Sequence, residues 1–309
     1  MSTLRLRLGT RASALARWQA HWVAAQLTSR GIDVELVPVT TRGDVHKRDR
    51  IENLGSPGVF TKELQRALVD RRIDLAVHSL KDLPTESVEG LCLAAVPERE
   101  SPRDALVSRE GLRFDQLPPG AAVGTGSLRR RAQLLYARSD LRLLDVRGNV
   151  DTRLKKLAGG GYDALVLAQA GLVRLGLEDQ ITEVFEPDRM LPAVGQGALA
   201  IEARAADRET CQAVAPLDHG PTRQAVVAER VLLANLRGGC LAPVGAWARL
   251  QSDGLLRLDA VVLSPDGRRR LAAFAAGPID EAPRLGADVA ARLIADGASE
   301  LIAQSRSTR

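Results

Sequence analysis

Two neighbouring residues of opposite charge follow an apolar segment in the first third of the chain. The sequence there reads IDLAVHSLKDLP, so Lys81 and Asp82 come directly after residues 73–79, which we expect to form a buried strand. A carboxylate in this position can stabilise positive charge that develops during a reaction. Two structural roles stay open for Asp82, as a helix N-cap or as a partner of Lys81. His78 is either a general base or a hydrogen-bonded core residue.

A glycine-rich segment followed by arginines predicts an anion-binding site. The sequence GTGSLRRR at residues 124–131 joins a predicted strand to a predicted helix. Its glycines let the backbone approach a ligand, Ser127 opens the helix with free N–H groups, and Arg129 and Arg130 lie in the first turn. A nucleotide-binding P-loop is the competing interpretation, but its G-x-x-x-x-G-K-[ST] spacing is absent.

Basic residues recur in the segments that follow the other predicted strands. Ligands of parallel α/β sheets bind at the carboxyl ends of the strands, so these segments are expected to meet around a ligand. Arginine's planar guanidinium group suits carboxylate and phosphate ligands. The segments are GTRAS at 9–13, TTRGD at 40–44, VRGNVDTR at 146–153 and AGLVRLG at 170–176.

The three cysteines are far apart in the sequence. Cys92, Cys211 and Cys240 form no C-x-x-C pair, so we expect neither a disulfide framework nor a metal site. Cys240 stands in NLRGGCLAPVGAW at residues 235–247, between two glycines and a proline-containing turn. A thiol in such a loop is expected to be accessible.

The composition limits the classes of partner. The chain has 309 residues, 45% of them hydrophobic, and a net charge of +5 that favours acidic ligands. Aromatic residues make up only 3%, which is poor material for stacking nucleic-acid bases. No apolar run is long enough to span a membrane, and the N-terminus does not resemble a signal peptide. We therefore expect a cytoplasmic protein that binds neither nucleic acid nor membrane.

The elements that must position these residues form two similar α/β units. Alternating strands and amphipathic helices indicate parallel sheets covered by helices, and two such units imply a cleft between them. The first helix is predicted to bury Leu15, Trp18 and Trp22. A strand at 198–203 should return the chain to the first unit, so the two crossings would form a hinge. Strands are predicted at 4–8, 34–39, 73–79, 121–126, 142–146 and 163–168.

The last third of the chain has a different pattern of strands and helices from the two α/β units. Three strands at 244–250, 255–263 and 268–274, followed by a helix through Leu285, Val289 and Leu293, indicate a small α+β domain with an antiparallel sheet. We therefore predict three domains. The first combines residues 1–97 with 198–217, the second covers 103–192, and the third covers 220–309 and carries Cys240.

Eight motifs in order along nearly the whole chain resemble the porphobilinogen deaminase (hydroxymethylbilane synthase) family. They are GTRAS, TRGD, AVHSLKDLP, GTGSLRR, RGNVDTRL, AGLVRLG, LPAVGQGA and RGGCLAPVG. The resemblance implies two domains of the periplasmic-binding-protein fold with a hinge and cleft, and a third α+β domain. It also implies a monomeric transferase of tetrapyrrole and haem biosynthesis, which condenses four porphobilinogen molecules into hydroxymethylbilane with loss of ammonia.

The resemblance further implies a covalent dipyrromethane cofactor, bound through a thioether to Cys240. By motif match Asp82 is the catalytic aspartate, which stabilises the cation left when ammonia departs. The residues matched to cofactor binding are Lys81, Ser13, Thr125, Gly126, Ser127, Arg129, Arg130, Arg147 and Gly148. Those matched to substrate binding are Arg11, Arg153, Arg174 and Gln196. The acetate and propionate groups of porphobilinogen explain why arginines are needed.

One segment departs from the family pattern. Many members have a lysine in G-G-K-G-[LM]-F, whereas residues 55–60 of this chain read GSPGVF. We expect this segment to act as a lid and assign no lysine to it. Two alternatives from other classes remain, a hinged anion receptor without enzymatic activity and a cysteine-dependent acyltransferase or hydrolase that uses Cys240.

Overall fold

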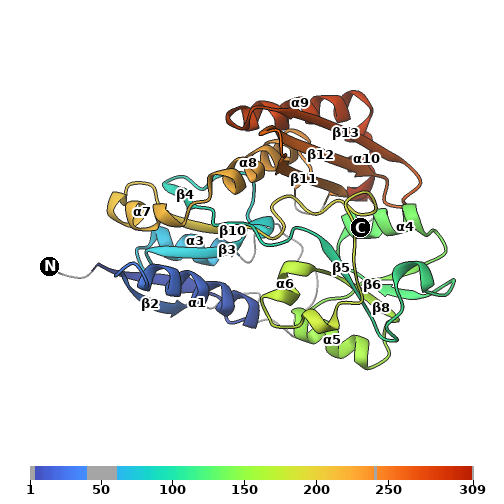
Figure 1. Ribbon diagram of the computed structural model, residues 1–309, viewed down its shortest axis with the longest axis horizontal. Helices are drawn as coiled ribbons and strands as arrows, with labels where there is room; N and C mark the ends of the chain where they lie inside the picture. Colours follow the sequence, from blue (N-terminus) through green and yellow to red (C-terminus); the bar gives the residue numbers. More distant parts are fainter. Residues whose placement is uncertain (1–3, 40–60, 240–241, 308–309) are drawn as a thin grey trace. The chain divides into compact units, whose positions relative to one another are not determined.

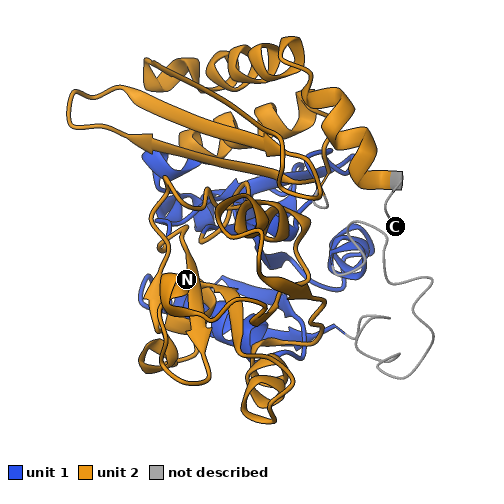
Figure 2. Ribbon diagram, turned by 90° about the vertical axis from the view of Figure 1, so that its right-hand side faces the viewer, with its two compact units in different colours: residues 1–99, 198–223 blue, residues 100–197, 224–309 orange. Residues whose placement is uncertain are grey.

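The computed structural model describes residues 4–39, 61–239 and 242–307. The chain divides into two compact units, which Figure 2 shows in different colours. Unit 1 contains residues 1–99 and 198–223, and unit 2 contains residues 100–197 and 224–309. Within the described ranges the strands form three sheets, one in unit 1 and two in unit 2. Figure 1 shows the elements of each.

Unit 1 is built on a five-stranded mixed sheet of order β2-β1-β3-β10-β4. β1 is parallel to β2 and β3, whereas β10 is antiparallel to its neighbours β3 and β4. One apolar core contains Leu8 and Val23, and a second contains Leu64 and Ala76, because helices cover both faces. The elements are β1 (Arg5–Thr10), α1 (Ala14–Thr28), β2 (Asp33–Pro38), α3 (Lys62–Val69), β3 (Leu75–Ser79), β4 (Leu91–Ala95), β10 (Leu199–Arg204) and α7 (Arg208–Val214).

The first helix begins where the sequence predicts, and Trp22 of its predicted buried face packs against the core, but Trp18 does not. Ser13 caps α1 by accepting a hydrogen bond from the backbone N–H of Ala16 at 3.3 Å. The prediction that Trp18 is buried is wrong, since 36% of it is exposed. Small and aliphatic residues of α1, among them Ala20 and Val23, lie against the sheet instead.

The first part of unit 2 repeats this plan. Its sheet has the order β7-β6-β8-β5-β9, with β6 parallel to β7 and β8, and with β5 antiparallel to β8 and β9. Successive residues of β8, such as Leu165 and Val166, enter cores on opposite faces. The elements are β5 (Asp104–Ser108), β6 (Ala122–Gly124), α4 (Leu128–Ala137), β7 (Arg142–Leu144), α5 (Val150–Ala158), β8 (Ala164–Ala168), α6 (Gln169–Val173) and β9 (Glu183–Val184).

The remaining part of unit 2 is an antiparallel sheet covered by helices. β11 (Val244–Leu250), β12 (Leu256–Leu263) and β13 (Arg270–Gly277) form a meander, as predicted. Its helices are α8 (Gly220–Asn235, of which 224–235 belong to unit 2), α9 (Ala282–Ala295) and α10 (Ala298–Ser307). The buried carboxylate of Glu229 on α8 accepts hydrogen bonds from the N–H of Ala248 on β11 and of Gly195.

The fold class predicted from the sequence is confirmed, because two α/β sheets are accompanied by a small α+β region with an antiparallel sheet. The two α/β sheets are mixed and not purely parallel as expected, since β10 in one and β5 in the other run antiparallel to their neighbours. Short 3-10 turns complete the described structure. They are Leu80–Asp82, Phe114–Gln116, Glu178–Gln180, Ala215–Leu217 and Ile279–Glu281.

Candidate active site

In unit 1, four of the predicted site residues follow two adjacent parallel strands. Arg11 and Ser13 come after the carboxyl end of β1, and Lys81 and Asp82 come after the carboxyl end of β3. Because β1 and β3 are parallel neighbours, both segments leave the same edge of the sheet. The unit 1 sheet therefore brings these two motifs together.

Asp82 is the last residue of a short 3-10 turn and is exposed. The turn is held by its backbone, since the N–H of Leu80 donates to the carbonyl of Ala198 and the N–H of Leu83 donates to the carbonyl of Leu80, both at 3.0 Å. Leu80 is buried in addition. Ser79, not Asp82, is the N-cap residue of this turn. A fixed backbone thus presents the Asp82 carboxylate at the surface of unit 1.

His78 belongs to the interior of unit 1. Its Nε2 atom lies 2.8 Å from Oε2 of Glu202 on the neighbouring strand β10, and both side chains are buried. The side-chain amide of Gln65 donates to the same carboxylate at 3.1 and 3.2 Å. Of the two roles left open for His78, this geometry supports that of a polar core residue.

In unit 2, the predicted site residues gather at one edge of the five-stranded sheet. The parallel strands β6, β7 and β8 end at Gly124, Leu144 and Ala168, and each is followed by part of the predicted site. Strand β5 is antiparallel to β8, and its first residue, Asp104, pairs with Ala168, the last residue of β8. Strand β5 therefore begins at this edge. The residues concerned are Thr125, Gly126, Ser127, Arg129, Arg130, Arg147, Gly148, Arg153 and Arg174.

The segment after β6 forms the N-terminus of α4. The Ser127 hydroxyl caps the helix by accepting from the N–H of Arg130 at 3.4 Å, and the Thr125 hydroxyl accepts from the N–H of Ser127 at 3.2 Å. Gly126 is exposed. A Cβ atom there would lie 3.0 Å from the carbonyl oxygen of Val146, which explains the small residue. Backbone N–H groups and the helix dipole favour an anion at this position.

Arg129 and Arg130 converge on one buried carboxylate, that of Asp104. Arg129 donates from Nη1 to Oδ2 at 2.6 Å and from Nη2 to Oδ1 at 3.2 Å. Arg130 donates from Nε to Oδ1 at 2.9 Å. The side-chain amide of Gln196 adds a hydrogen bond to Oδ1 at 2.9 Å. These four residues form what we call the Asp104 cluster.

The charges of the Asp104 cluster hold its carboxylate in the ionised form. Burial alone would raise the pKa of Asp104, but the positive charges of Arg129 and Arg130, with their hydrogen bonds, hold that pKa well below its usual range. Burial also lowers the pKa of Arg130, which the Asp104 charge opposes. Sequence reasoning missed Asp104. The available signal was a charged residue at the start of the apolar run DALVS.

The segment after β7 presents two further arginines. Arg147 is 62% exposed and pairs with Asp145 at 3.0 Å, and Nε of Arg153 donates to the carbonyl of Gly148 at 2.8 Å. Gly148 has φ of +114°, in the region that favours glycine, and an added Cβ would lie 2.7 Å from the side chain of Thr152. Asn149 then caps α5. The tight turn places the backbone of both arginines at the sheet edge.

Arg174 lies at the end of α6 and is buried. Its Nη2 atom donates to the carbonyl of Gly197 at 2.6 Å. Burial lowers the pKa of Arg174 to about 10, against the opposing charge of Glu100. The guanidinium group therefore remains a cation at neutral pH.

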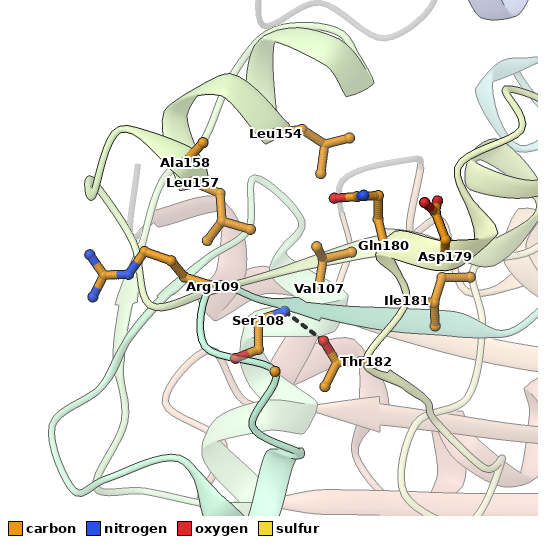
Figure 3. Close-up of a pocket in the computed structure, with 11 residues that line it drawn as sticks. Val107, Ser108, Arg109, Leu154, Leu157, Ala158, Asp179, Gln180, Ile181 and Thr182 are labelled. Atoms are coloured by element: carbon orange, nitrogen blue, oxygen red, sulfur yellow. Dashed lines mark hydrogen bonds between the residues drawn. The ribbon is translucent and has the colours of Figure 1, made fainter.

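A separate hollow of about 460 Å³ opens in unit 2. Leu154, Leu157 and Ile181 form part of its apolar lining, and Arg109 and Asp179 are among its charged residues (Figure 3). None of its eleven lining residues belongs to the predicted site. Arg109 is already engaged, since it pairs with Asp163 at 3.2 Å. This hollow is therefore distinct from the edge where the arginines gather.

Three of the expectations fall on residues outside the described ranges, and two others concern absences. Cys240, the segment TTRGD and the lid expected at 55–60 are all outside the described ranges. Among described residues, no group of three potential ligands is arranged to hold a metal ion. None of the described helices is long and apolar enough to cross a membrane.

Comparison with known proteins identifies the family. Residues 6–212 match the model of the "porphobilinogen deaminase, dipyromethane cofactor binding domain", and residues 223–295 match the "porphobilinogen deaminase, C-terminal domain". The chain is 52% identical over 285 residues to porphobilinogen deaminase of Thermobifida fusca (strain YX), covering 92% of this chain and 89% of that protein. It is also 52% identical over 285 residues to porphobilinogen deaminase of Desulforudis audaxviator (strain MP104C), covering 92% of each.

Among solved structures, the methionine-binding protein MetQ matches with a TM-score of 0.45 and 14% identity, covering 75% of this chain and 94% of that one. The sequence matches carry the family assignment, because the two family models together span both compact units. The chain belongs to the porphobilinogen deaminase family, and its first 212 residues include the domain that binds the dipyrromethane cofactor in that family.

Proposed function

We propose that this protein is a hydroxymethylbilane synthase that condenses four porphobilinogen molecules head to tail and releases ammonia. Membership of the family supports this reaction. The observation that carries the proposal is the gathering of five arginines at the carboxyl edge of the first sheet of unit 2. Porphobilinogen bears an acetate and a propionate, so a growing chain accumulates negative charge, which guanidinium groups bind well.

Asp82 is the proposed catalytic residue. Loss of ammonia from the aminomethyl group leaves positive charge on the substrate, and a nearby carboxylate stabilises that charge. The same carboxylate can hold or move a proton at the pyrrole nitrogens. The exposed side chain on a fixed 3-10 turn supports this role, because such a group reaches a ligand without rearrangement of the fold.

The residues present fit a dipyrromethane. Its carboxylates require cationic and N–H donors, and the N-terminus of α4 with the surrounding arginines offers both. When bound, the cofactor supplies the pyrrole end to which the first substrate is joined. We propose Cys240 as its thioether anchor. We assign cofactor binding to Ser13, Lys81, Thr125, Gly126, Ser127, Arg129, Arg130, Arg147 and Gly148, and substrate binding to Arg11, Arg153, Arg174 and Gln196.

We propose three domains, which cover residues 1–97 with 198–217, residues 103–192 and residues 220–309. The three separate sheets support this division, since each has a main apolar core of its own, and only a small cluster that includes Ala132 and Val261 joins the second and third among the described residues. We further propose that the protein is a cytoplasmic monomer that binds neither nucleic acid nor membrane. Size-exclusion chromatography with light scattering measures the mass in solution, and a dimer would contradict the monomer.

Incubation of the purified protein with porphobilinogen tests the proposed function. We expect four molecules of porphobilinogen and four of ammonia for each bilane, measured by the dimethylaminobenzaldehyde reaction, by an ammonia assay and by the absorbance of the uroporphyrin that forms after cyclisation and oxidation. Binding of porphobilinogen without release of ammonia would favour the receptor alternative and contradict the proposal.

A further inference from the structure

The Asp104 cluster gives the two adjacent arginines of α4 a shared counter-ion. The carboxylate of Asp104 is fully buried, while Arg129 is 3% and Arg130 is 6% exposed. Each oxygen of the carboxylate accepts from at least one guanidinium group, with the shortest distances at 2.6 Å to Arg129 and 2.7 Å to Arg130. An arginine side chain has many rotamers, and a buried bidentate partner selects one of them.

Backbone carbonyls complete the fixation of both side chains. Nη1 of Arg129 donates to the carbonyl of Leu191 at 2.7 Å, and Nη1 of Arg130 donates to the carbonyl of Val166 at 2.9 Å. Asp104 itself is fixed as the first residue of β5, opposite the last residue of β8. The two guanidinium groups therefore have defined positions at the end of the sheet where α4 begins.

The charge of the cluster is unbalanced. Two guanidinium groups and one carboxylate sum to a formal charge of +1, because the Gln196 side chain is neutral. The buried Nε of Arg129 donates to no described group. A buried cationic cluster with an unused donor is stabilised by one further anion. A ligand carboxylate at this edge would supply it.

We propose that Asp104 is a positioning residue for the reaction, which orients Arg129 and Arg130 and sets their joint charge so that one carboxylate of the dipyrromethane or growing chain neutralises it. This inference rests on the proposed function. Asp104 does not touch the substrate in this account and acts through the arginines alone. Without it, the two guanidinium groups would repel each other and lose their common orientation.

The test follows conversion of apoprotein to holoprotein, which is measured by intact mass and needs no turnover of the loaded enzyme. Apoprotein is made in cells that lack porphobilinogen and is then incubated with porphobilinogen at a temperature well below unfolding. For Asp104→Asn, which keeps size but removes charge, we expect the rate of dipyrromethane attachment to fall about tenfold or more. A fall of less than about threefold would overturn the proposal. If the fall lies between about threefold and tenfold, Asp104→Glu decides, and attachment by Asp104→Glu at the wild-type rate would also overturn the proposal.

A matched control separates positioning from general stability. Asp74 in unit 1 also bridges two arginines, Arg7 at 3.0 Å and Arg204 at 2.8 Å, but it precedes β3 and so lies at the opposite edge of its sheet from Asp82. Asp74→Asn is expected to lose thermal stability while attachment proceeds at the wild-type rate. If Asp74→Asn slowed attachment as much as Asp104→Asn, the effect would be general and the positioning role would fail.

Three further outcomes have defined meanings. If Asp104→Asn does not fold, Asp104→Glu decides, because it retains the charge but shifts the carboxylate by one methylene; slower attachment supports the inference and the wild-type rate overturns it. If wild-type apoprotein gains no dipyrromethane at all, the proposed function fails. If the wild type gains it and Asp104→Asn gains it equally fast, the inference about Asp104 fails alone.

Discussion

Nη1 of Arg129 lies 2.6 Å from Oδ2 of Asp104, and both side chains are buried. The arginine that the sequence motif marks as a carboxylate ligand is thus already bound to a carboxylate of its own protein. This relationship changes the expected behaviour of the site. Such an arginine would bind a second anion from a fixed position, and its removal would leave Asp104 short of a partner.

Replacement of Asp82 by asparagine should separate catalysis from folding. We expect Asp82→Asn to retain the fold and the dipyrromethane but to lose turnover by about 100-fold or more, because the amide cannot stabilise the developing cation. The exposed side chain predicts a change in unfolding free energy within about 0.5 kcal/mol. Steady-state kinetics and urea unfolding measure the two effects. Near-normal turnover would reduce Asp82 to a structural residue.

Removal of Arg147 should weaken ligand binding without affecting stability. Arg147 is 62% exposed at the carboxyl edge, so Arg147→Leu should slow elongation about tenfold through loss of a charged hydrogen bond to a substrate or cofactor carboxylate. Arg142→Leu is the matched control, because Arg142 is an exposed residue at the start of the same β7 strand. Equal effects in both variants would argue against a specific site at the carboxyl edge.

Gly148→Ala should disturb the turn that positions two arginines. The backbone at φ +114° and the clash with Thr152 predict a loss of about 1–3 kcal/mol of unfolding free energy or a rearranged turn. Displacement of Arg147 and Arg153 should then slow dipyrromethane attachment. Chemical denaturation and intact mass record the two effects, and an unchanged protein would show that the turn adapts to a side chain.

Asp74→Asn should lower stability in a pH-dependent manner. Burial alone would raise the pKa of Asp74, but hydrogen bonds from Arg7 and Arg204 lower it to about 2 from 3.8. A pKa lowered by folding stabilises the protein above the unfolded value, and this stabilisation is lost as the pH falls from about 4 towards 2. We expect a loss of about 1–2 kcal/mol at pH 7, reduced for partial exposure.

The difference in unfolding free energy between wild type and Asp74→Asn should therefore shrink as the pH falls below about 4. Urea unfolding at pH 7 and at acid pH measures it. A difference that stays constant across this range would mean that the carboxylate contributes through shape and not through its charge.

Strand and motif positions could be predicted because they depend on local pattern. The apolar runs of β3 and β8 and the meander β11–β13 were recognisable from residue types, and the order of strands then placed the motifs at sheet edges. Trp18 was predicted wrongly, since helical spacing gives an approximate face but does not say which residues at its margin meet the sheet. Neighbouring Ala20 and Val23 pack more closely there.

The Asp104 cluster could not be predicted, because it depends on tertiary structure. Asp104 is the second residue of the predicted domain 103–192, in the segment SPRDAL, where no motif marks it as a site residue, and it begins β5. Its partners are 25 and 26 residues away in sequence, on a helix that follows a different strand. No residue pattern indicates that Gln196, 92 residues from Asp104, contacts the same carboxylate.

Intact mass of the purified protein, followed by peptide mapping, tests the central claim most directly. We expect the protein to carry the added mass of two linked pyrrole units, and we expect this addition to map to the peptide that contains Cys240. Cys240→Ala should lack both the addition and activity. An active protein with the mass of the unmodified chain, or an addition on another residue, would contradict this claim.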